Sequence, residues 1–392
     1  MEPETPTPLP VVSPHQGTFA GLGNSPENGE GRGPVPGARD LRWVFMGLHE
    51  LRAGWSVAIF LVLLMGLVTS FTFVIKALHL APESMDKVKE MTVRLGFMQE
   101  GASVLAIVVS AWIVARIERR RLSDYYLRGP RRVARFFSGL VTGFATLSLL
   151  VAGLTAGGWM HFGGVALSGG QIVMYAAGWC AVFLLVGCAE EGLARCFLLF
   201  TLARGLNFWV SFGLVVAMCA LATLNPKASG LWGAYVIALL GLAPCVALHV
   251  QKAPTEGFWE AAWVTSVFFG AGHTANPGEN WIGIFAAAGI GFVFCASVRL
   301  TGSVWWAIGC HAAWDWAESY FYGTPDSGLL AKGHLLTTTY SGPAIWSGGS
   351  DGPEGSLLTI PVMMVILLVL LVQYGRGPRA PAAEAIGEQA AG

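Results

Sequence analysis

Three groups of ionisable side chains interrupt apolar stretches of this sequence. They are Glu190, Glu191 and Arg195 in CAEEGLARC, His273 in FGAGH, and His311 and Asp315 in HAAWDW. A charged group at the centre of a membrane helix costs roughly 2.5–3.5 kcal/mol on insertion scales, so such residues are functional candidates by default. These side chains are therefore the first candidates for chemistry.

In the first group, the two neighbouring carboxylates, Glu190 and Glu191, point in different directions from the helix. Helical spacing puts Glu191 and Arg195 on one face as an i, i+4 pair. Glu190 lies about 100° round the helix from Glu191, so it escapes this pairing and can face a cavity as a general base. An ion-pair network that only locks helices together would explain Glu191 and Arg195 well, and Glu190 poorly.

The other two groups supply imidazoles. His273 ends a helix, and a single histidine there is usually without special function. His311 and Asp315 share a helix face, which fits a histidine oriented by a carboxylate or a pair of metal ligands. Together the three groups bring carboxylates, imidazoles and a guanidinium to three helices. Hydrolysis needs this inventory, with a base for water and donors for an oxyanion.

The composition indicates a membrane protein. The chain is 54% hydrophobic and 12% charged, its mean hydropathy is +0.57, and its net charge is zero. Soluble domains are nearer a quarter charged. Zero net charge gives no support for a nucleic-acid partner, and the lipid bilayer is the expected surrounding. The seven cysteines form no CxxC pair and are expected to act as small apolar fillers.

We predict an all-α, polytopic transmembrane bundle with about eight to ten membrane helices, because runs of roughly 20 apolar residues cross a bilayer. The expected spans lie near 54–78, 98–115, 136–156, 172–204, 207–225, 231–250, 258–275, 281–299, 303–321 and 356–374. The fourth is too long for one straight crossing and must tilt, kink or begin in the interface. The ninth is polar, and we expect it to be buried.

Arginines set the expected orientation. Eight of them crowd residues 116–135, so the positive-inside rule places that loop and the amino terminus in the cytoplasm; a binding site for anionic lipid is the alternative. The expected organisation is a disordered tail (1–42), N-terminal membrane helices with this loop (43–135), a catalytic membrane core (136–321), an irregular extracytoplasmic loop (322–355), and a last membrane helix with a short tail (356–392).

The ordered motifs EExxxR, FxxxH and HxxxD resemble the CPBP family of intramembrane proteases, also described as the Abi domain. The family includes bacteriocin-processing and immunity proteins of bacteria and the type II CAAX prenyl endopeptidases. The motifs read Glu190 to Arg195, Phe269 to His273 and His311 to Asp315. GSVWWAIGCHAAWDW is similar to the bacterial branch, which implies a bacterial cytoplasmic membrane.

The resemblance implies roles for these residues. Glu190 and His273 would activate water, His311 and Asp315 would stabilise the oxyanion, and Glu191, Arg195 and Phe269 would support them. The sequence departs from the family in two ways. A helical pair near 207–250 is inserted between the first two motifs, and position 315 is Asp where the prenyl endopeptidases have Asn.

The sequence leaves alternatives open for both the cofactor and the function. The family is often labelled metalloprotease, and one Glu with two His could bind zinc. However, HExxH is absent, and the resemblance favours a metal-free glutamate mechanism. The expected substrate is a membrane-associated peptide or protein. A non-catalytic immunity or peptide-binding protein is the rival, and an ion or proton carrier would need a continuous polar path.

Overall fold

The computed structural model describes residues 42–46, 50–79, 90–224, 230–276 and 278–376. The predicted N-terminal tail lies outside these residues except for Arg42, and so does most of the C-terminal tail. The chain divides into Met1–Trp43 and Val44–Gly392, and every membrane-length helix belongs to the second part. Within the described residues the fold is helical and has no large sheet, which confirms the predicted class.

The helices follow the apolar runs of the sequence. They are α1 (Arg42–Phe45), α2 (Ala53–Ala77), α3 (Val93–Ile117), η2 (Leu122–Asp124), α4 (Arg132–Ala156), α5 (Gly170–Glu191), η3 (Gly192–Leu198), α6 (Leu199–Ala203), α7 (Phe208–Leu224), α8 (Leu231–Val250), α9 (Glu256–His273), α10 (Trp281–Thr301), α11 (Trp305–Asp315), η4 (Trp316–Phe321), α12 (Ala344–Ser347), η5 (Pro353–Gly355) and α13 (Thr359–Tyr374).

Six helical segments of the described chain are long and apolar enough to cross a membrane: α2, α3, α4, α5 through α6, α8 and α10. Two further apolar helices, α7 and α13, have 17 and 16 residues. The expected spans near 258–275 and 303–321 are α9 and the run α11–η4, and neither is among the six. The predicted number of membrane helices is therefore reached only by counting short or polar helices.

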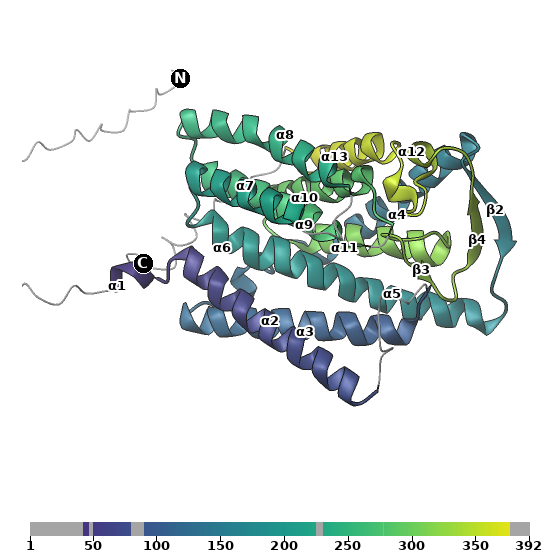
Figure 1. The fold of residues 1–392 in the computed structure, drawn as a ribbon, viewed down its shortest axis with the longest axis horizontal. Helices are drawn as coiled ribbons and strands as arrows, with labels where there is room; N and C mark the ends of the chain where they lie inside the picture. Colours follow the sequence, from purple (N-terminus) through teal and green to yellow (C-terminus); the bar gives the residue numbers. More distant parts are fainter. Residues whose placement is uncertain (1–41, 47–49, 80–89, 225–229, 277, 377–392) are drawn as a thin grey trace, which may run out of the picture. The chain divides into compact units, whose positions relative to one another are not determined.

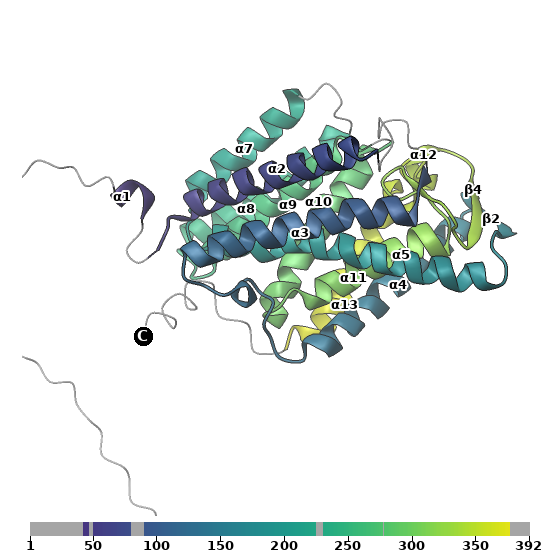
Figure 2. The same cartoon turned by 90° about the horizontal axis from the view of Figure 1, so that it is seen from below.

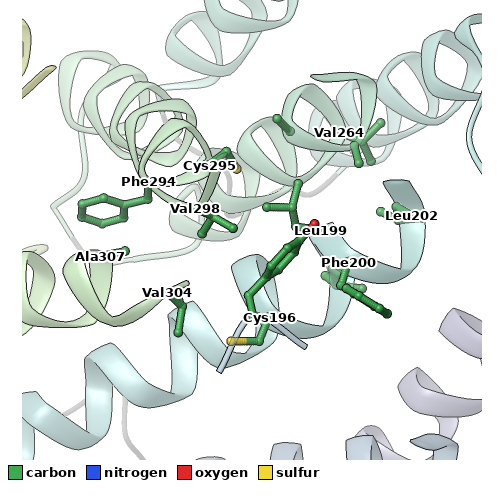
Figure 3. Packing of buried hydrophobic residues seen from close by; sticks show 14 of the residues in the cluster. Cys196, Leu199, Phe200, Leu202, Val264, Phe294, Cys295, Val298, Val304 and Ala307 are labelled. Carbon is green, nitrogen blue, oxygen red and sulfur yellow. The ribbon is translucent and has the colours of Figure 1, made fainter. Parts of the chain in front are cut away.

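The centre of the bundle lies around α9 and α10. In the most apolar window of α10, 67% of residues are buried within the protein, against 6% for α2. An apolar helix with so little burial is suited to face lipid. Figure 1 shows α9, α10 and α11 among the other helices, and Figure 3 shows Leu199, Val264, Phe294 and Val298 in the core that joins them.

Glycines bring α11 against α4. A Cβ added to Gly139 would lie 2.2 Å from the carbonyl oxygen of Trp306, and one added to Gly143 would lie 2.1 Å from that of Cys310. Gly309 makes the same approach from α11, since its Cβ would lie 2.2 Å from the oxygen of Phe136. Small residues allow such contact between membrane helices. Figure 2 shows the two helices together, and this contact sets the position of His311.

The long fourth segment is one continuous helical run from Gly170 to Ala203, through α5, η3 and α6. Its middle section, η3, is π-helical, and a second π-helical section, η4, continues α11. Each begins directly after an acidic residue of a predicted motif, Glu191 or Asp315. π-Helical turns are rare and frequent at functional sites. Neither section was predicted from the sequence.

Two small sheets join distant segments. Strand β2 (Met160–Val165) pairs antiparallel with β4 (Leu336–Tyr340), and β1 (Glu90–Met91) pairs parallel with β3 (Leu330–Ala331). The loop 322–355, predicted to be irregular, thus contains two short strands that its sequence did not indicate. These pairs tie the loop to the α4–α5 connection and to the start of α3.

Candidate active site

One cavity gathers the four side chains predicted to do chemistry. It has a volume of about 250 Å³, and its lining includes Glu190, His273, His311 and Asp315. These side chains come from α5, α9 and α11, and residues of α3, α10, α13 and the 322–355 loop complete the walls. The three helices that carry the predicted groups thus converge on one cavity. The chemical roles of the four residues remain predictions.

His311 lies at the centre of the site. Its Nδ1 is 2.9 Å from Glu191 Oε1, and its Nε2 is 3.5 Å from Asp315 Oδ2 and 3.7 Å from Glu190 Oε2. With Glu191 Oε1 as the acceptor, His311 Nδ1 carries a proton and donates a hydrogen bond to it. The Nε2 edge of His311 therefore faces two further carboxyl groups at the cavity.

Glu191 joins the guanidinium and the imidazole. Arg195 donates to Glu191 Oε1 at 3.1 Å, and both side chains are fully buried. The same oxygen accepts from His311. The Glu191–Arg195 pair follows the i, i+4 prediction. Orientation of His311 by Asp315 is one of the interpretations that the sequence leaves open. In the structure, Glu191 contacts His311 through Nδ1, and Asp315 lies near Nε2 on the other side of the ring.

Phe269 supports two groups at once, which accounts for the FxxxH spacing. Its ring lies 4.3 Å from the Arg195 guanidinium, within cation–π range. Its carbonyl oxygen accepts from His273 Nδ1 at 2.8 Å. A carbonyl only accepts, so His273 in its neutral form has its Nε2 free to accept. A Cβ added to Gly291 would lie 3.0 Å from Arg195 Nη2, so this glycine makes room for the guanidinium.

The expected pairing of Glu190 with His273 takes a different form. Across the described chain these two side chains share no direct hydrogen bond, although both line the cavity. The imidazole that Glu190 approaches directly is His311. Helical spacing gives the direction of a side chain on its own helix, but not which neighbouring helix it meets. A water between Glu190 and His273 would restore the predicted partnership.

The cavity also has polar walls that were not predicted from the sequence. They are Gln99, Glu100, Asn276, Ser319, Asp326, Ser327 and Glu354. Glu100 interrupts the apolar α3, so the rule that singled out Glu190 would have found it too. Asp326 and Glu354 belong to the 322–355 loop, where a carboxylate is unremarkable by sequence.

Three acidic residues of the 322–355 loop, Asp326, Asp351 and Glu354, have raised pKa values. Burial, with the neighbouring Asp326 and Asp351 carboxylates, raises the pKa of Glu354 to about 8. Burial raises the pKa of Asp326 to about 6 and that of Asp351 to about 7. Trp314 Nε1 donates to Glu354 Oε1 at 2.7 Å, and Ser319 Oγ donates to Asp326 Oδ2 at 3.2 Å. At this edge of the cavity, burial and mutual repulsion therefore favour the protonated form of the carboxyl groups.

A protein-family comparison matches residues 245–317 with the family described as type II CAAX prenyl endopeptidase Rce1-like. The match supports assignment of the chain to the CPBP/CAAX protease family. The matched segment contains Phe269, His273, His311 and Asp315, whereas Glu190 precedes it. No curated protein and no solved structure shows significant similarity to the chain. The matched family is a protease family, and six membrane-length helices in the described residues support an integral membrane protein.

Proposed function

We propose that this protein is an intramembrane endopeptidase that hydrolyses a peptide bond in a membrane-associated protein or peptide. The observation that carries the proposal is the position of the Glu190 carboxylate, 3.7 Å from His311 Nε2, on the wall of a cavity that also holds His273 and Asp315. A base and an oxyanion partner on either side of one small space are what amide hydrolysis requires.

In the proposed reaction Glu190 removes a proton from a water molecule, and the water oxygen attacks the peptide carbonyl carbon. The neutral His273 directs its free Nε2 at the same water. Protonated His311, held through Nδ1 by Glu191, donates from Nε2 to the oxygen that becomes negative. Asp315, as a carboxylic acid, is a second donor. The proton on Glu190 then passes to the amide nitrogen, and the C–N bond breaks.

A metal-free mechanism is part of the proposal. Within the described residues, two three-residue groups have ligand atoms close enough to share an ion: His249 with Glu256 and Glu260, and Glu318 with Asp326 and Glu354. Neither includes Glu190, His273 or His311. In addition, His311 Nδ1 is engaged by Glu191.

A chelator tests the metal-free mechanism. We expect a zinc-selective chelator, applied with Ca²⁺ present, to leave turnover intact. Activity that is lost with the chelator and restored by stoichiometric zinc would reverse the assignment.

We further propose that the arginine-rich end, and with it the amino terminus, lies in the cytoplasm of a bacterial cell. Figure 1 shows the end of α3, where the arginine-rich stretch begins, on the opposite side of the helices from β2 and β4. This separation is consistent with one end on each side of a bilayer, and the arginines select the cytoplasmic one.

Membrane proteomes of cells that produce wild-type protein or Glu190→Gln test the activity. Gln keeps the shape of Glu but cannot take the proton, so protein fragments present with wild type are expected to vanish. Glu90→Gln, an exposed acid on β1, is the control and is expected to keep those fragments. An unchanged fragment pattern in Glu190→Gln, with equal protein levels, would favour a non-catalytic peptide-binding protein.

A further inference from the structure

Three carboxylates meet beneath the 322–355 loop, beside the proposed active site. Glu318 comes from η4, Asp326 from the following turn and Glu354 from η5. Each offers an oxygen that lies within 4.8 Å of the others. We call Glu318, Asp326 and Glu354 the loop acid cluster. Asp326 and Glu354 line the cavity, so the cluster forms part of its wall.

Glu318 has no partner for its charge. The residue is 0% exposed, and neither carboxylate oxygen has a hydrogen-bond partner. Asp326 and Glu354 accept one hydrogen bond each, from Ser319 and Trp314. Among the described residues, no Lys or Arg forms an ion pair with the cluster. An unpaired buried carboxylate costs several kcal/mol, so Glu318 lacks a compensating positive group.

We propose that the loop acid cluster binds a calcium ion. Three carboxylates offer only oxygen ligands, which select a hard cation over zinc or copper. Calcium takes oxygens at 2.3–2.6 Å, so two ligands on opposite sides of the ion lie roughly 4.6–5.2 Å apart. The spacing of the three oxygens fits that limit. Magnesium, at 2.0–2.1 Å, requires tighter and more regular geometry.

A cationic side chain of a substrate fits this place less well. Glu318 is fully buried, so a lysine or arginine from a bound peptide would have to pass between the loop segments. The loop backbone lies close to Glu318, because a Cβ added to Gly352 would lie 2.1 Å from the Pro325 carbonyl oxygen and 3.4 Å from Glu318 Oε1. A single ion needs far less space.

The ion would fasten the loop to the active-site helix. Glu318 follows Asp315 by three residues in the same helical run, while Asp326 and Glu354 belong to two separate loop segments. Calcium shared by all three would hold these segments together at the cavity wall. Its binding requires no peptide hydrolysis, so the site stands or falls independently of the proposed function.

Calcium binding to the purified full-length protein tests the proposal. After chelator treatment and desalting, calorimetry with Ca²⁺ is expected to give one ion per chain, with a Kd of roughly 10⁻⁵–10⁻³ M. Glu318→Gln is expected to raise the Kd at least about tenfold. Should that variant fail to fold, Glu354→Gln and Asp326→Asn carry the same expectation. Glu256→Gln, in the His249–Glu256–Glu260 group, is the matched control and should leave the Kd unchanged.

Terbium luminescence locates the ion. Tb³⁺ replaces Ca²⁺, and Trp314, whose Nε1 lies 2.7 Å from Glu354 Oε1, is positioned to sensitise it. Emission should appear with wild type, fall in Trp314→Phe and disappear on addition of Ca²⁺. Wild type that binds no Ca²⁺, or cluster variants that bind it as wild type does, would overturn the proposal. Loss of binding in Glu256→Gln alone would also overturn it.

Discussion

Buried charge is handled in opposite ways at two ends of this bundle. Near the end of α3, Arg204 pairs with Glu118 at 3.0 Å and with Glu50 at 2.8 Å, while Arg120 also contacts both acids. We call Glu50, Glu118, Arg120 and Arg204 the arginine–glutamate network. It has two positive and two negative side chains. The loop acid cluster has three negative side chains and no positive one.

The two regions differ in whether they contain their own counter-charges. The arginine–glutamate network contains its own counter-charges, so it can stabilise the helix ends without a ligand. The loop acid cluster is complete only with an external cation or with protons. The proposed active site lies between these extremes, since Arg195 and His311 face Glu190, Glu191 and Asp315. Because the acidic side chains of the proposed active site outnumber the positive ones, some of them stay available to exchange protons with a substrate or water.

The largest expected loss of stability comes from opening the arginine–glutamate network. Glu118 is fully buried and faces Arg204 and Arg120. Glu118→Gln leaves those guanidinium groups with less counter-charge, so we expect the free energy of unfolding to fall by about 3–5 kcal/mol. Denaturation of the purified variant in detergent measures it. The exposed Glu90→Gln serves as control, and a loss of less than about 1 kcal/mol in Glu118→Gln, the size of a surface ion pair, would contradict a structural role.

Substitutions of Asp315 distinguish two roles for its side chain, a protonated donor to the oxyanion and an ionised carboxylate. If Asp315 donates to the oxyanion, Asn can replace it, and Asp315→Asn should keep most of the turnover. Asp315→Ala removes the donor and should lower turnover by roughly 10²–10³-fold, the usual cost of one such donor. Peptide cleavage by the purified variants measures both. If Asn is as damaging as Ala while the protein stays folded, the ionised carboxylate is the active form.

Between the two charged regions, the α4–α11 contact fixes the active site by packing. A Cβ at position 143 would lie 2.1 Å from the Cys310 carbonyl oxygen. We expect Gly143→Ala to lower the free energy of unfolding by about 1–3 kcal/mol, the cost of overpacking. Gly213→Ala in α7 is the matched control, because nothing lies within 4 Å of its added Cβ. Thermal unfolding of both variants gives the comparison, and equal midpoints would argue against a tight contact.

A smaller effect, of opposite sign, is expected at the loop acid cluster. Without divalent cations, Glu318 must either keep an unpaired buried charge or take up a proton, and Glu318→Gln removes this cost. The substitution should therefore raise the free energy of unfolding by about 1–2 kcal/mol. With Ca²⁺ present the advantage should disappear, because only wild type gains a ligand. Unfolding midpoints in chelator and in Ca²⁺ measure both conditions. A variant less stable than wild type in chelator would show that Glu318 is compensated within the protein.

The sequence predicts contacts within one helix better than contacts between helices. Apolar runs indicate the helices, and i, i+4 spacing indicates the Glu191–Arg195 pair. The contact of Glu191 with His311 joins α5 to α11, and it depends on glycine-mediated packing and π-helical turns that periodicity does not reveal. Strand β4 is short, and its register depends on β2, which lies far earlier in the chain. The loop acid cluster forms only when three segments fold together.

The role of Glu190 as the base of a peptide hydrolysis is the central claim. The most direct test reconstitutes the purified protein in lipid vesicles with a substrate taken from the fragments that vanish in Glu190→Gln cells, and measures the rate at which the new amino terminus appears. We predict a rate at least about 10²-fold lower for Glu190→Gln, with an unchanged free energy of unfolding. Equal rates for the wild type and Glu190→Gln would contradict the claim.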